Sequence, residues 1–228
     1  MKRRATIVLS LGGSLIVPDA IAVSFLKRFR RLILAQAARG FRFIIVCGGG
    51  NTARRYQTGA HAVTPMSPRQ LDWVGIAATK INAELVRVIF GSSAYPVVVD
   101  DPTVRIRSRQ PIIIGSGWKP GCSSDKDAVL LARTYGAALV INMSNIPYVY
   151  TADPHRVPSA KPIRQMTWRA LLGITGRRWH PGAHVPFDPQ AALLAQREKM
   201  RVIVCEGRNL ANLKNILLGK RYQGTTIS

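Results

Sequence analysis

The chain has 228 residues, of which 47% are hydrophobic, so it suits one large domain or two fused lobes with an ample core. No stretch is long and apolar enough to predict a membrane-spanning helix, and three widely separated cysteines (Cys47, Cys122 and Cys205) exclude a disulfide framework and predict a reducing cytoplasm. The net charge of +22 attracts nucleotides and RNA alike, but it is spread along the chain without an RNA-binding motif, so we predict only non-specific contact with nucleic acid.

The first part of the chain alternates apolar strands with amphipathic helices. Phe43–Cys47 is a continuous run rich in Ile and Val, which is typical of a strand buried on both faces of a parallel sheet. Up to residue 110 we predict strands at Thr6–Leu11, Phe43–Cys47 and Val97–Val99. We predict helices at Val23–Arg39, from Asn51 onward and at Leu71–Phe90. The stretch His61–Gln70 is predicted to be a loop, and 104–109 an edge strand or exposed arm.

The second part continues the same alternation. We predict strands at Ile112–Ile114, Ala138–Asn142, Arg201–Cys205 and Thr225–Ile227, a short strand or hairpin at Tyr148–Tyr150, a loop at Val157–Ile163, and helices from Ala128 onward and at Trp168–Leu172, Pro189–Met200 and Leu210–Leu218. Sustained alternation of strand and helix predicts an α/β fold, a three-layer sandwich with a largely parallel central sheet and helices on both faces.

Glycine-rich turns follow two of the predicted strands directly. Gly12-Gly13-Ser14 comes after the first strand, and Gly48-Gly49-Gly50 comes after the strand that ends at Cys47. Glycine lets the backbone turn tightly and approach a ligand without a Cβ atom in the way. Asn51 is predicted to cap the next helix, which carries Arg54 near its start, so strand, turn, helix N-terminus and arginine together predict a phosphate site.

Two further segments carry more polar or irregular sequence than their predicted elements require. The helix at Leu71–Phe90 has Asp72, Gly75, Thr79 and Asn82 on nearby turns; a capping role explains Asp72 alone but not the set. The stretch GSGWKPGCSSD at 115–125 is longer than a connector between a strand and a helix needs. The loops after parallel strands converge on one edge of the sheet, which is where ligands bind in such folds.

The sequence excludes several common nucleotide sites. It contains no G-x-x-x-x-G-K-[ST] motif, no G-x-G-x-x-G after a strand, and no His or Cys set with metal-ligand spacing, so no protein-held metal is predicted. Glycine turns, helix N-termini, an arginine and a few carboxylates such as Asp125 remain. These groups suit phosphoryl transfer, which needs two phosphates held in line and their charge neutralised by donors and Mg²⁺.

Seven ordered motifs resemble those of the amino acid kinase family, and within it the uridylate kinases of the archaeal type. They are LGGSLIVPD (11–19), VCGGGNTARRY (46–56), LDWVGIAATKINA (71–83), GWKPGCSSDKDAVLLA (117–132), SNIPYVYTADP (144–154), and VPFDPQAA with the terminal GTTI. The resemblance runs from end to end. It implies an amino acid kinase-like fold in one domain (1–228), with a UMP-binding lobe at about 1–135 and an ATP-binding lobe at about 136–228.

The resemblance also implies the transfer of a phosphoryl group from ATP to UMP with Mg²⁺ bound to ATP, in a homo-oligomer that is usually a hexamer. Residue by residue it implies a catalytic role for Gly13, Arg54 and Asp125; UMP contacts for Gly49, Asp72 (on the ribose), Trp118, Lys119, Pro120, Gly121, Cys122, Ser123 and Ser124; and ATP contacts for Ser10, Leu11, Gly12, Gly13, Ser14, Gly50, Arg54, Ser144, Asn145, Tyr150 and Asp153.

Three positions depart from the family pattern. Ser10 stands where many members of the wider family have a catalytic lysine, so the cationic role is expected to move to Arg54. Cys122 replaces a usual histidine, and Pro147 replaces the Asp-Gly turn common before the adenine-contacting tyrosine. Two other functions stay open at this point: a kinase of the same fold for an acid, a carbamate or an isoprenoid phosphate, and a non-catalytic nucleotide sensor or RNA-associated protein.

Overall fold

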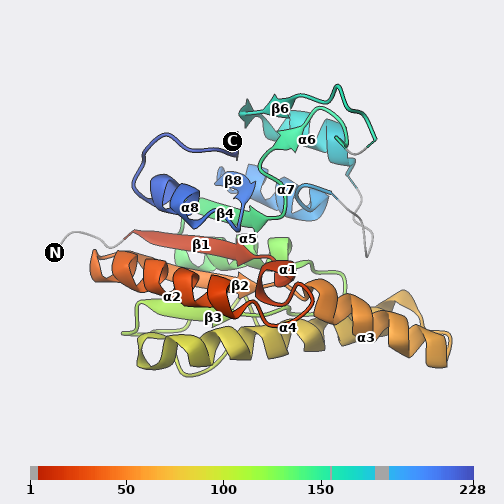
Figure 1. Ribbon diagram of the computed structural model, residues 1–228, viewed down its shortest axis with the longest axis horizontal. Helices are drawn as coiled ribbons and strands as arrows, with labels where there is room; N and C mark the ends of the chain where they lie inside the picture. The colour runs from red at the N-terminus through yellow and green to blue at the C-terminus, as the bar shows by residue number, and fades with distance from the viewer. Residues whose placement is uncertain (1–4, 155, 178–184) are drawn as a thin grey trace.

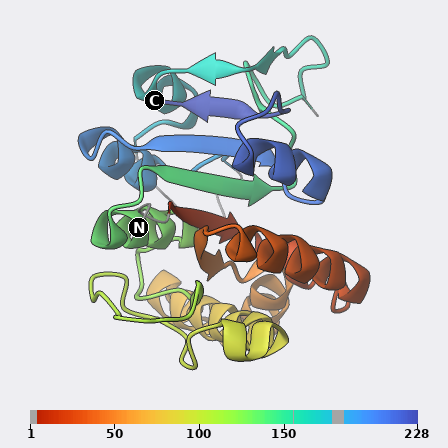
Figure 2. The same cartoon turned by 90° about the vertical axis from the view of Figure 1, so that its left-hand side faces the viewer.

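The computed structural model describes residues 5–154, 156–177 and 185–228. A seven-stranded sheet with the order β3-β2-β1-β4-β8-β9-β7 runs through the centre of the molecule (Figure 2). Neighbouring strands are parallel except for β8 and β9, which pair antiparallel. β5 and β6 form a separate antiparallel pair. The largely parallel α/β sandwich predicted from the alternation of elements is confirmed.

The strands are β1 (Thr6–Leu11), β2 (Arg42–Cys47), β3 (Ile112–Gly115), β4 (Leu139–Ser144), β5 (Val149–Tyr150), β6 (Pro162–Ile163), β7 (Gln165–Met166), β8 (Arg201–Glu206) and β9 (Thr225–Ile227). The helices are α1 (Gly13–Ile16), α2 (Val23–Ala38), α3 (Gly50–Val63), α4 (Pro68–Phe90), α5 (Ser124–Tyr135), α6 (Trp168–Thr175), α7 (Pro189–Arg197) and α8 (Leu210–Leu217), with one 3-10 turn at Gly91–Ser93.

Helices cover both faces of the sheet. Successive side chains of each strand point to opposite faces, so apolar strands give the sheet two faces that must be buried. Ile7 and Leu9 of β1 belong to the core beneath α2, α4 and α8, whereas Val8 belongs to the core beneath α5, α6 and α7. In Figure 1, α2 lies in front of the sheet and α5 behind it. β1, β2, β3 and β4 are parallel neighbours, so the segments that follow them lie at one edge.

The connection between α3 and α4 is shorter than predicted. The predicted loop at His61–Gln70 is wrong, because α3 runs to Val63 and α4 begins at Pro68. Ser67 and Gln70 form a reciprocal capping box in which each side chain accepts a hydrogen bond from the other residue's backbone N–H. Pro68 occupies the first helical position, where a proline is tolerated because its missing N–H has no helical partner there.

Two other predicted elements differ in the structure. Asn51 does not cap α3; Gly49 is the N-cap, and the Asn51 side chain donates to the carbonyl of Pro18 instead. The predicted strand at Val97–Val99 is reduced to a bridge between Val99 and Gly115. Pro96 lacks the N–H that regular pairing requires, and Val97 is 58% exposed, so pairing with β3 is limited to isolated bridges at Ala94 and Val99.

α3 differs from the other long helices because none of its 14 residues is buried. It packs on α1 and on the first half of α4, and Figure 1 shows α3 and α4 side by side at one end of the molecule. Tyr56 and Val63 of α3 are 67% and 87% exposed. The helix therefore contributes its N-terminal end to the sheet edge, and its outer surface is not covered by the residues that the structure describes.

Candidate active site

The glycine turns after β1 and β2 pack directly against each other, backbone on backbone. The N–H of Gly48 donates to the carbonyl of Leu11 over 2.9 Å. A Cβ atom at Gly13 would overlap backbone atoms of Gly48, Gly49 and Gly50 at separations that real Cβ atoms do not show. Gly50 has a φ of 56°, a left-handed conformation that glycine adopts without strain. Only glycine allows these two turns to meet.

Arg54 connects the same two turns from the side of α3. Its guanidinium donates to Oγ of Ser14 over 3.2 Å and to Oδ1 of Asn51. The first backbone N–H groups of a helix have no partner within the helix, and a helix N-terminus favours a negative charge. The turns, the two helix starts and Arg54 therefore form a surface suited to the oxygens of a polyphosphate.

Asp125, in the first turn of α5, accepts hydrogen bonds from three different segments. Oδ1 accepts from Ser10 Oγ and from Asn142 Nδ2, both over 3.1 Å, and Oδ2 accepts from the backbone N–H of Asp188 over 3.3 Å. Asp125 thereby ties the ends of β1 and β4 to the start of α7. Ser10, at the family's usual lysine position, acts here as a hydrogen-bond donor to this carboxylate.

Asp188 and Asn142 are members of this cluster that sequence reasoning did not assign to the site. Asp188 is 3% exposed and caps α7, with Oδ1 accepting from the N–H groups of Gln190 and Ala191. Its Oδ2 accepts from Ser123 Oγ, which links it to the loop before α5. The signal was present in the segment VPFDPQAA, but Asp188 there reads as a helix cap, which it also is.

Burial raises the pKa of two carboxyl groups on α5. The pKa of Asp125 rises from 3.8 to about 7 because its carboxyl group is desolvated and faces the charge of Asp188, against the lowering effect of its hydrogen bonds. The pKa of Asp127 also rises from 3.8 to about 7, chiefly through burial, while the Trp118 N–H and Lys126 oppose the shift. Both groups titrate near neutral pH.

These raised pKa values predict that the folded state loses stability between pH 5 and pH 8. Asp125 and Asp127 bind protons more tightly in the folded chain than in the unfolded chain, so their contribution is fully present below about pH 4 and is lost as the pH rises through about 7. The pKa values of Glu84 and Asp101 are lowered, so these groups titrate outside that window. Urea unfolding at pH 5 and pH 8 measures the difference; equal stability at both values would contradict it.

One face of α4 supports both the second glycine turn and the loop at 115–123. Asn82 Nδ2 donates to the carbonyls of Gly48 (2.9 Å) and Gly49 (3.2 Å), and Thr79 Oγ1 accepts from the N–H of Gly117 over 2.8 Å. One turn from the start of the helix, Asp72 Oδ2 accepts from the N–H of Gly121 over 3.0 Å. Asp72 is therefore not the helix cap; Ser67 is. Their spacing places the set on one side of the helix.

The loop itself is built around a tight turn. Lys119, Pro120, Gly121 and Cys122 form it, closed by a 3.1 Å hydrogen bond from the N–H of Cys122 to the carbonyl of Lys119. Proline second and glycine third, with a φ of 81° at the glycine, are typical of a type II turn. The Lys119 ammonium lies 3.7 Å from the centre of the Trp118 ring. Burial raises the pKa of the Cys122 thiol, which argues against a reactive cysteine.

The residues predicted for the adenosine end follow β4. The carbonyl of Ser144 accepts from the N–H of Gly207 over 2.8 Å, and its hydroxyl contacts Asn145. Tyr150 lies in β5 opposite Pro162, and Asp153 pairs with Arg156 at 3.7 Å. β4 is the direct neighbour of β1, so this segment begins at the same edge of the sheet as the first glycine turn.

The described residues contain no group of three or more His, Cys, Asp or Glu side chains that could hold a metal ion. Mg²⁺ in phosphoryl-transfer sites is usually held by one or two carboxylates together with substrate phosphates. Asp125 and Asp188 supply two adjacent carboxylates beside the glycine turns. The donor set therefore fits a cation that arrives with a nucleotide. None of the described helices is long and apolar enough to cross a membrane.

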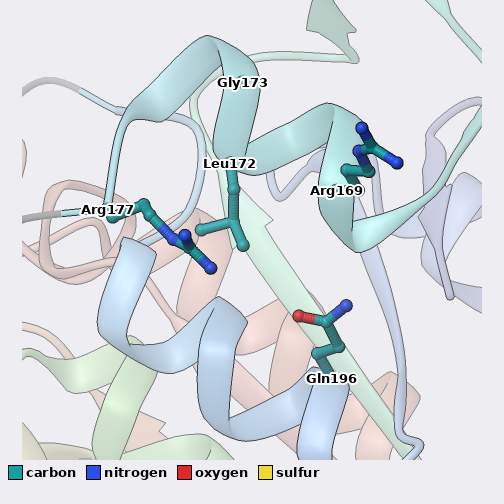
Figure 3. Close-up of a pocket in the computed structure, with 5 residues that line it drawn as sticks. All are labelled: Arg169, Leu172, Gly173, Arg177 and Gln196. Atoms are coloured by element: carbon teal, nitrogen blue, oxygen red, sulfur yellow. The ribbon is translucent and has the colours of Figure 1, made fainter.

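A separate pocket of about 380 Å³ lies between α6 and α7 (Figure 3). Leu172 points into it, while Arg177 and Gln196 approach it from opposite sides. None of its lining residues belongs to the predicted site. The lining runs along α6 from Arg169 to Gly173 and includes Gln196 near the C-terminal end of α7, so we assign the pocket no part in the predicted site.

Comparison with known proteins supports the reading of these motifs. The sequence model of the amino acid kinase family matches residues 5–206. The chain is 35% identical to the uridylate kinase of Thermoplasma acidophilum, covering 97% of this chain and 96% of that protein, and 33% identical to the uridylate kinase of Methanospirillum hungatei, covering 98% and 94%.

Solved structures show the same fold. Uridylate kinase from Archaeoglobus fulgidus has 30% sequence identity to this chain, and its structure superposes with a TM-score of 0.84. The match covers 97% of this chain and 99% of that one. The UMP kinase from Bacillus anthracis, at 20% identity, superposes with a TM-score of 0.80 over 99% of this chain and 97% of that one. The chain therefore belongs to the amino acid kinase family.

Proposed function

We propose that the protein is a UMP kinase, which transfers the γ-phosphoryl group of ATP to UMP and yields ADP and UDP for pyrimidine nucleotide synthesis. The observation that carries the proposal is the backbone contact between the glycine turns after β1 and β2, with the 115–123 loop held beside them by α4. Two phosphate groups held at these turns face each other across one edge of the sheet. Relatives over nearly the full length that are named uridylate kinases support the choice of acceptor.

On the donor side, we propose that the segment from Ser10 to Ser14 and Gly50 contacts the ATP phosphates. Free N–H groups at the starts of α1 and α3 bind the oxygens, and their dipoles favour the negative charge. Ser144, Asn145, Tyr150 and Asp153 then take the adenosine end. The parallel pairing of β1 with β4 supports this arrangement, because it brings the two donor segments to neighbouring strand ends.

On the acceptor side, we propose that Asp72 contacts the ribose and Gly49 contacts the UMP phosphate. The loop from Trp118 to Ser124 closes over the nucleotide. Only Oδ2 of Asp72 accepts from Gly121, which leaves Oδ1 for a ribose hydroxyl. A nucleoside fits α4 better than an isoprenoid tail does, because Asp72, Thr79 and Asn82 make this face of the helix polar.

In the transfer step, an oxygen of the UMP phosphate attacks the γ-phosphorus and the bond from that phosphorus to the bridging oxygen of ADP breaks. Arg54 lies between the two turns and stabilises the charge that develops on the transferring group. Asp125 holds Ser10, Asn142 and the start of α7 in fixed positions around it. When Mg²⁺ is bound with ATP, it neutralises charge on the phosphates.

The proposal is tested by offering purified protein Mg-ATP with UMP, CMP, AMP or acetylglutamate and following the release of ADP. Release with UMP alone supports a UMP kinase. Release with acetylglutamate would assign the protein to another kinase of the same fold. Nucleotide binding without release from any acceptor would favour the non-catalytic sensor.

Arg54→Ala is expected to lower kcat by about 100-fold or more while changing either KM much less. The guanidinium matters most where negative charge develops, so its loss raises the barrier more than it weakens ground-state binding. The neighbouring Arg55→Ala is the matched control, because among the described residues the Arg55 guanidinium bonds to the exposed Asp19 alone, so its loss should leave kcat unchanged. Steady-state kinetics measure both variants, and equal kinetics for the two would remove Arg54 from the site.

Asp72→Ala is expected to raise KM for UMP by about 10-fold to 100-fold with little change in KM for ATP. It removes a charged acceptor for the ribose and also releases the N–H of Gly121. Asp100→Ala is the control, because Asp100 forms an ion pair with Lys80 in which both side chains are about half exposed. A parallel rise in both KM values would show that Asp72 does not act on the acceptor alone.

We further propose a cytoplasmic homo-oligomer, a hexamer by family resemblance, built from two lobes at about 1–135 and 136–228. The outer surface of α3, where Tyr56 and Val63 are exposed and no residue is buried, supports self-association. Light scattering of the purified protein gives the mass. The charge of +22 supports non-specific contact with nucleic acid, which should weaken steeply with salt.

A further inference from the structure

Asp127 has the lowest residue exposure of the acidic residues that the structure describes. Its residue exposure is 0%, and it lies in the first turn of α5, two positions after Asp125. Residues two apart on a helix project about 200° from each other, so the two carboxylates face different surroundings. Asp127 Oδ2 accepts from the backbone N–H of Trp118 over 3.2 Å, whereas Oδ1 has no hydrogen-bond partner among the described residues.

This arrangement is unfavourable for folding considered alone. A buried carboxylate with an unpartnered oxygen loses its hydration without full replacement. The charges near it are Lys126, which attracts it, and Asp188 and Asp125, which repel it, and the Cys122 thiol also lies within electrostatic reach. An apolar side chain of similar size would be better tolerated at a buried position. The hydrogen bond from the Trp118 N–H is the favourable contact that requires an acceptor at position 127.

That hydrogen bond completes a three-point attachment of the central part of the loop, from Gly117 to Gly121. Thr79 accepts from Gly117 and Asp72 accepts from Gly121, and both acceptors belong to α4. Asp127 accepts from Trp118 and belongs to α5. The loop is therefore held at a set distance from two helices. The two ends of the loop are also held, by the hydrogen bond from the Ser116 N–H to the carbonyl of Val99 and by the one from Ser123 Oγ to Asp188. Without Asp127, the central part of the loop would keep only the two contacts from α4 among the described residues.

We propose that Asp127 is a positioning residue that holds the 115–123 loop ready for the acceptor nucleotide, and so sets the affinity for UMP and not the rate of transfer. The inference rests on the proposed function, because that function makes this loop the acceptor loop. Asp127 itself is buried and touches no substrate. It acts through the backbone of Trp118, whose neighbours Lys119, Pro120 and Gly121 form the turn above Asp72.

The test compares Asp127→Ala with Asp127→Asn. Asparagine keeps an acceptor for the Trp118 N–H and removes the buried charge, so this variant should keep KM for UMP within about 3-fold of wild type. Alanine removes the acceptor. It should raise KM for UMP by about 10-fold, the change expected when a hydrogen bond to a charged group is lost, with kcat and KM for ATP changed less than about 3-fold.

Amide hydrogen exchange of a peptide covering 116–123, followed by mass spectrometry without nucleotide, provides a second readout. Exchange should be faster in Asp127→Ala than in wild type and unchanged in Asp127→Asn. Thr79→Val, which removes the hydroxyl beneath Gly117 with little change of shape, should also speed exchange and raise KM for UMP. If Asp127→Ala does not fold, this variant still tests whether a loosened loop raises KM for UMP, and no rise in KM despite faster exchange would overturn the proposal.

Unchanged exchange in Asp127→Ala, or a rise in KM for UMP matched by KM for ATP, would overturn the positioning role. So would an Asp127→Asn variant as impaired as Asp127→Ala, because the acceptor would then not be what matters. A wild-type protein that transfers phosphate to no acceptor would reject the proposed function instead. The exchange comparison does not depend on turnover, so it still decides whether Asp127 holds the loop.

Discussion

Gly13→Ala is expected to lower kcat by about 100-fold or more and to lower the melting temperature. The added Cβ would overlap backbone atoms of Gly48, Gly49 and Gly50, and none of these can move as a flexible side chain would. The turns after β1 and β2 must then separate. Displacing two reacting groups by about 1 Å is enough to cost about 100-fold in rate. Steady-state kinetics and thermal unfolding measure the two effects.

Gly59→Ala is the matched control for this substitution. Gly59 lies in α3, is exposed, and has no atom within 4 Å of the position where its Cβ would be. Alanine in a helix interior is favoured over glycine by about 1 kcal/mol, so Gly59→Ala should keep full activity and gain some stability. A Gly13→Ala variant with wild-type kinetics would show that close contact between the turns is not needed for transfer.

Asp125→Asn is expected to lower kcat by about 100-fold while the protein stays folded. All three partners of the Asp125 carboxylate are donors: Ser10 and Asn142 on one oxygen and the N–H of Asp188 on the other. The amide of asparagine has only one acceptor atom. In one orientation its NH₂ group meets the N–H of Asp188; in the other, Ser10 and Asn142 must turn from donors into acceptors, so the hydrogen bonds that position these groups change in either case. A shift of about 1 Å in these segments would lower the rate of transfer by about 100-fold, as for the glycine turns.

Asp127→Asn is the matched control for Asp125→Asn. Both residues lie in the same helical turn, and the pKa of each carboxyl group is raised to about 7. Asp127→Asn should leave kcat within about 3-fold of wild type, since its carboxylate does not contact Ser10 or Asn142. Each variant removes one carboxyl group with a raised pKa. In both, the free energy of unfolding should therefore change less between pH 5 and pH 8 than in the wild type. Equal loss of kcat in both would point to the charge of α5 and not to the hydrogen bonds of Asp125.

Several parts of the fold and the site were predictable because their signals are local. The apolar runs at β1, β2 and β4 and the glycine turns after them can be read from short segments, and strand–helix alternation gives parallel pairing. The polar set on α4 was also recognisable from spacing alone. The prediction failed at 61–70, where two prolines indicated a loop, although Ser67, Pro68 and Gln70 form a strong helix start.

Other features depend on residues that are distant in the sequence. Asp188 lies 63 positions after Asp125 and carries an ordinary capping signal, so its hydrogen bond to Asp125 is visible only once the chain is folded. Asn142 reads as a polar residue at the end of a strand until Asp125 is seen opposite to it. Asp127 reads as one more acidic residue in the first turn of a helix, where such residues are favoured by the dipole.

The sequence alone determined the class of fold, the order of its elements and the positions of the glycine turns, because hydrophobic period and backbone freedom are properties of neighbouring residues. The tertiary structure decided which turns touch, that Asp125 is shared by three segments, and that Asp127 is buried with one oxygen unpaired. Those outcomes depend on the distances between strands and helices far apart in the chain. Packing of the whole domain sets these distances, and no local pattern encodes them.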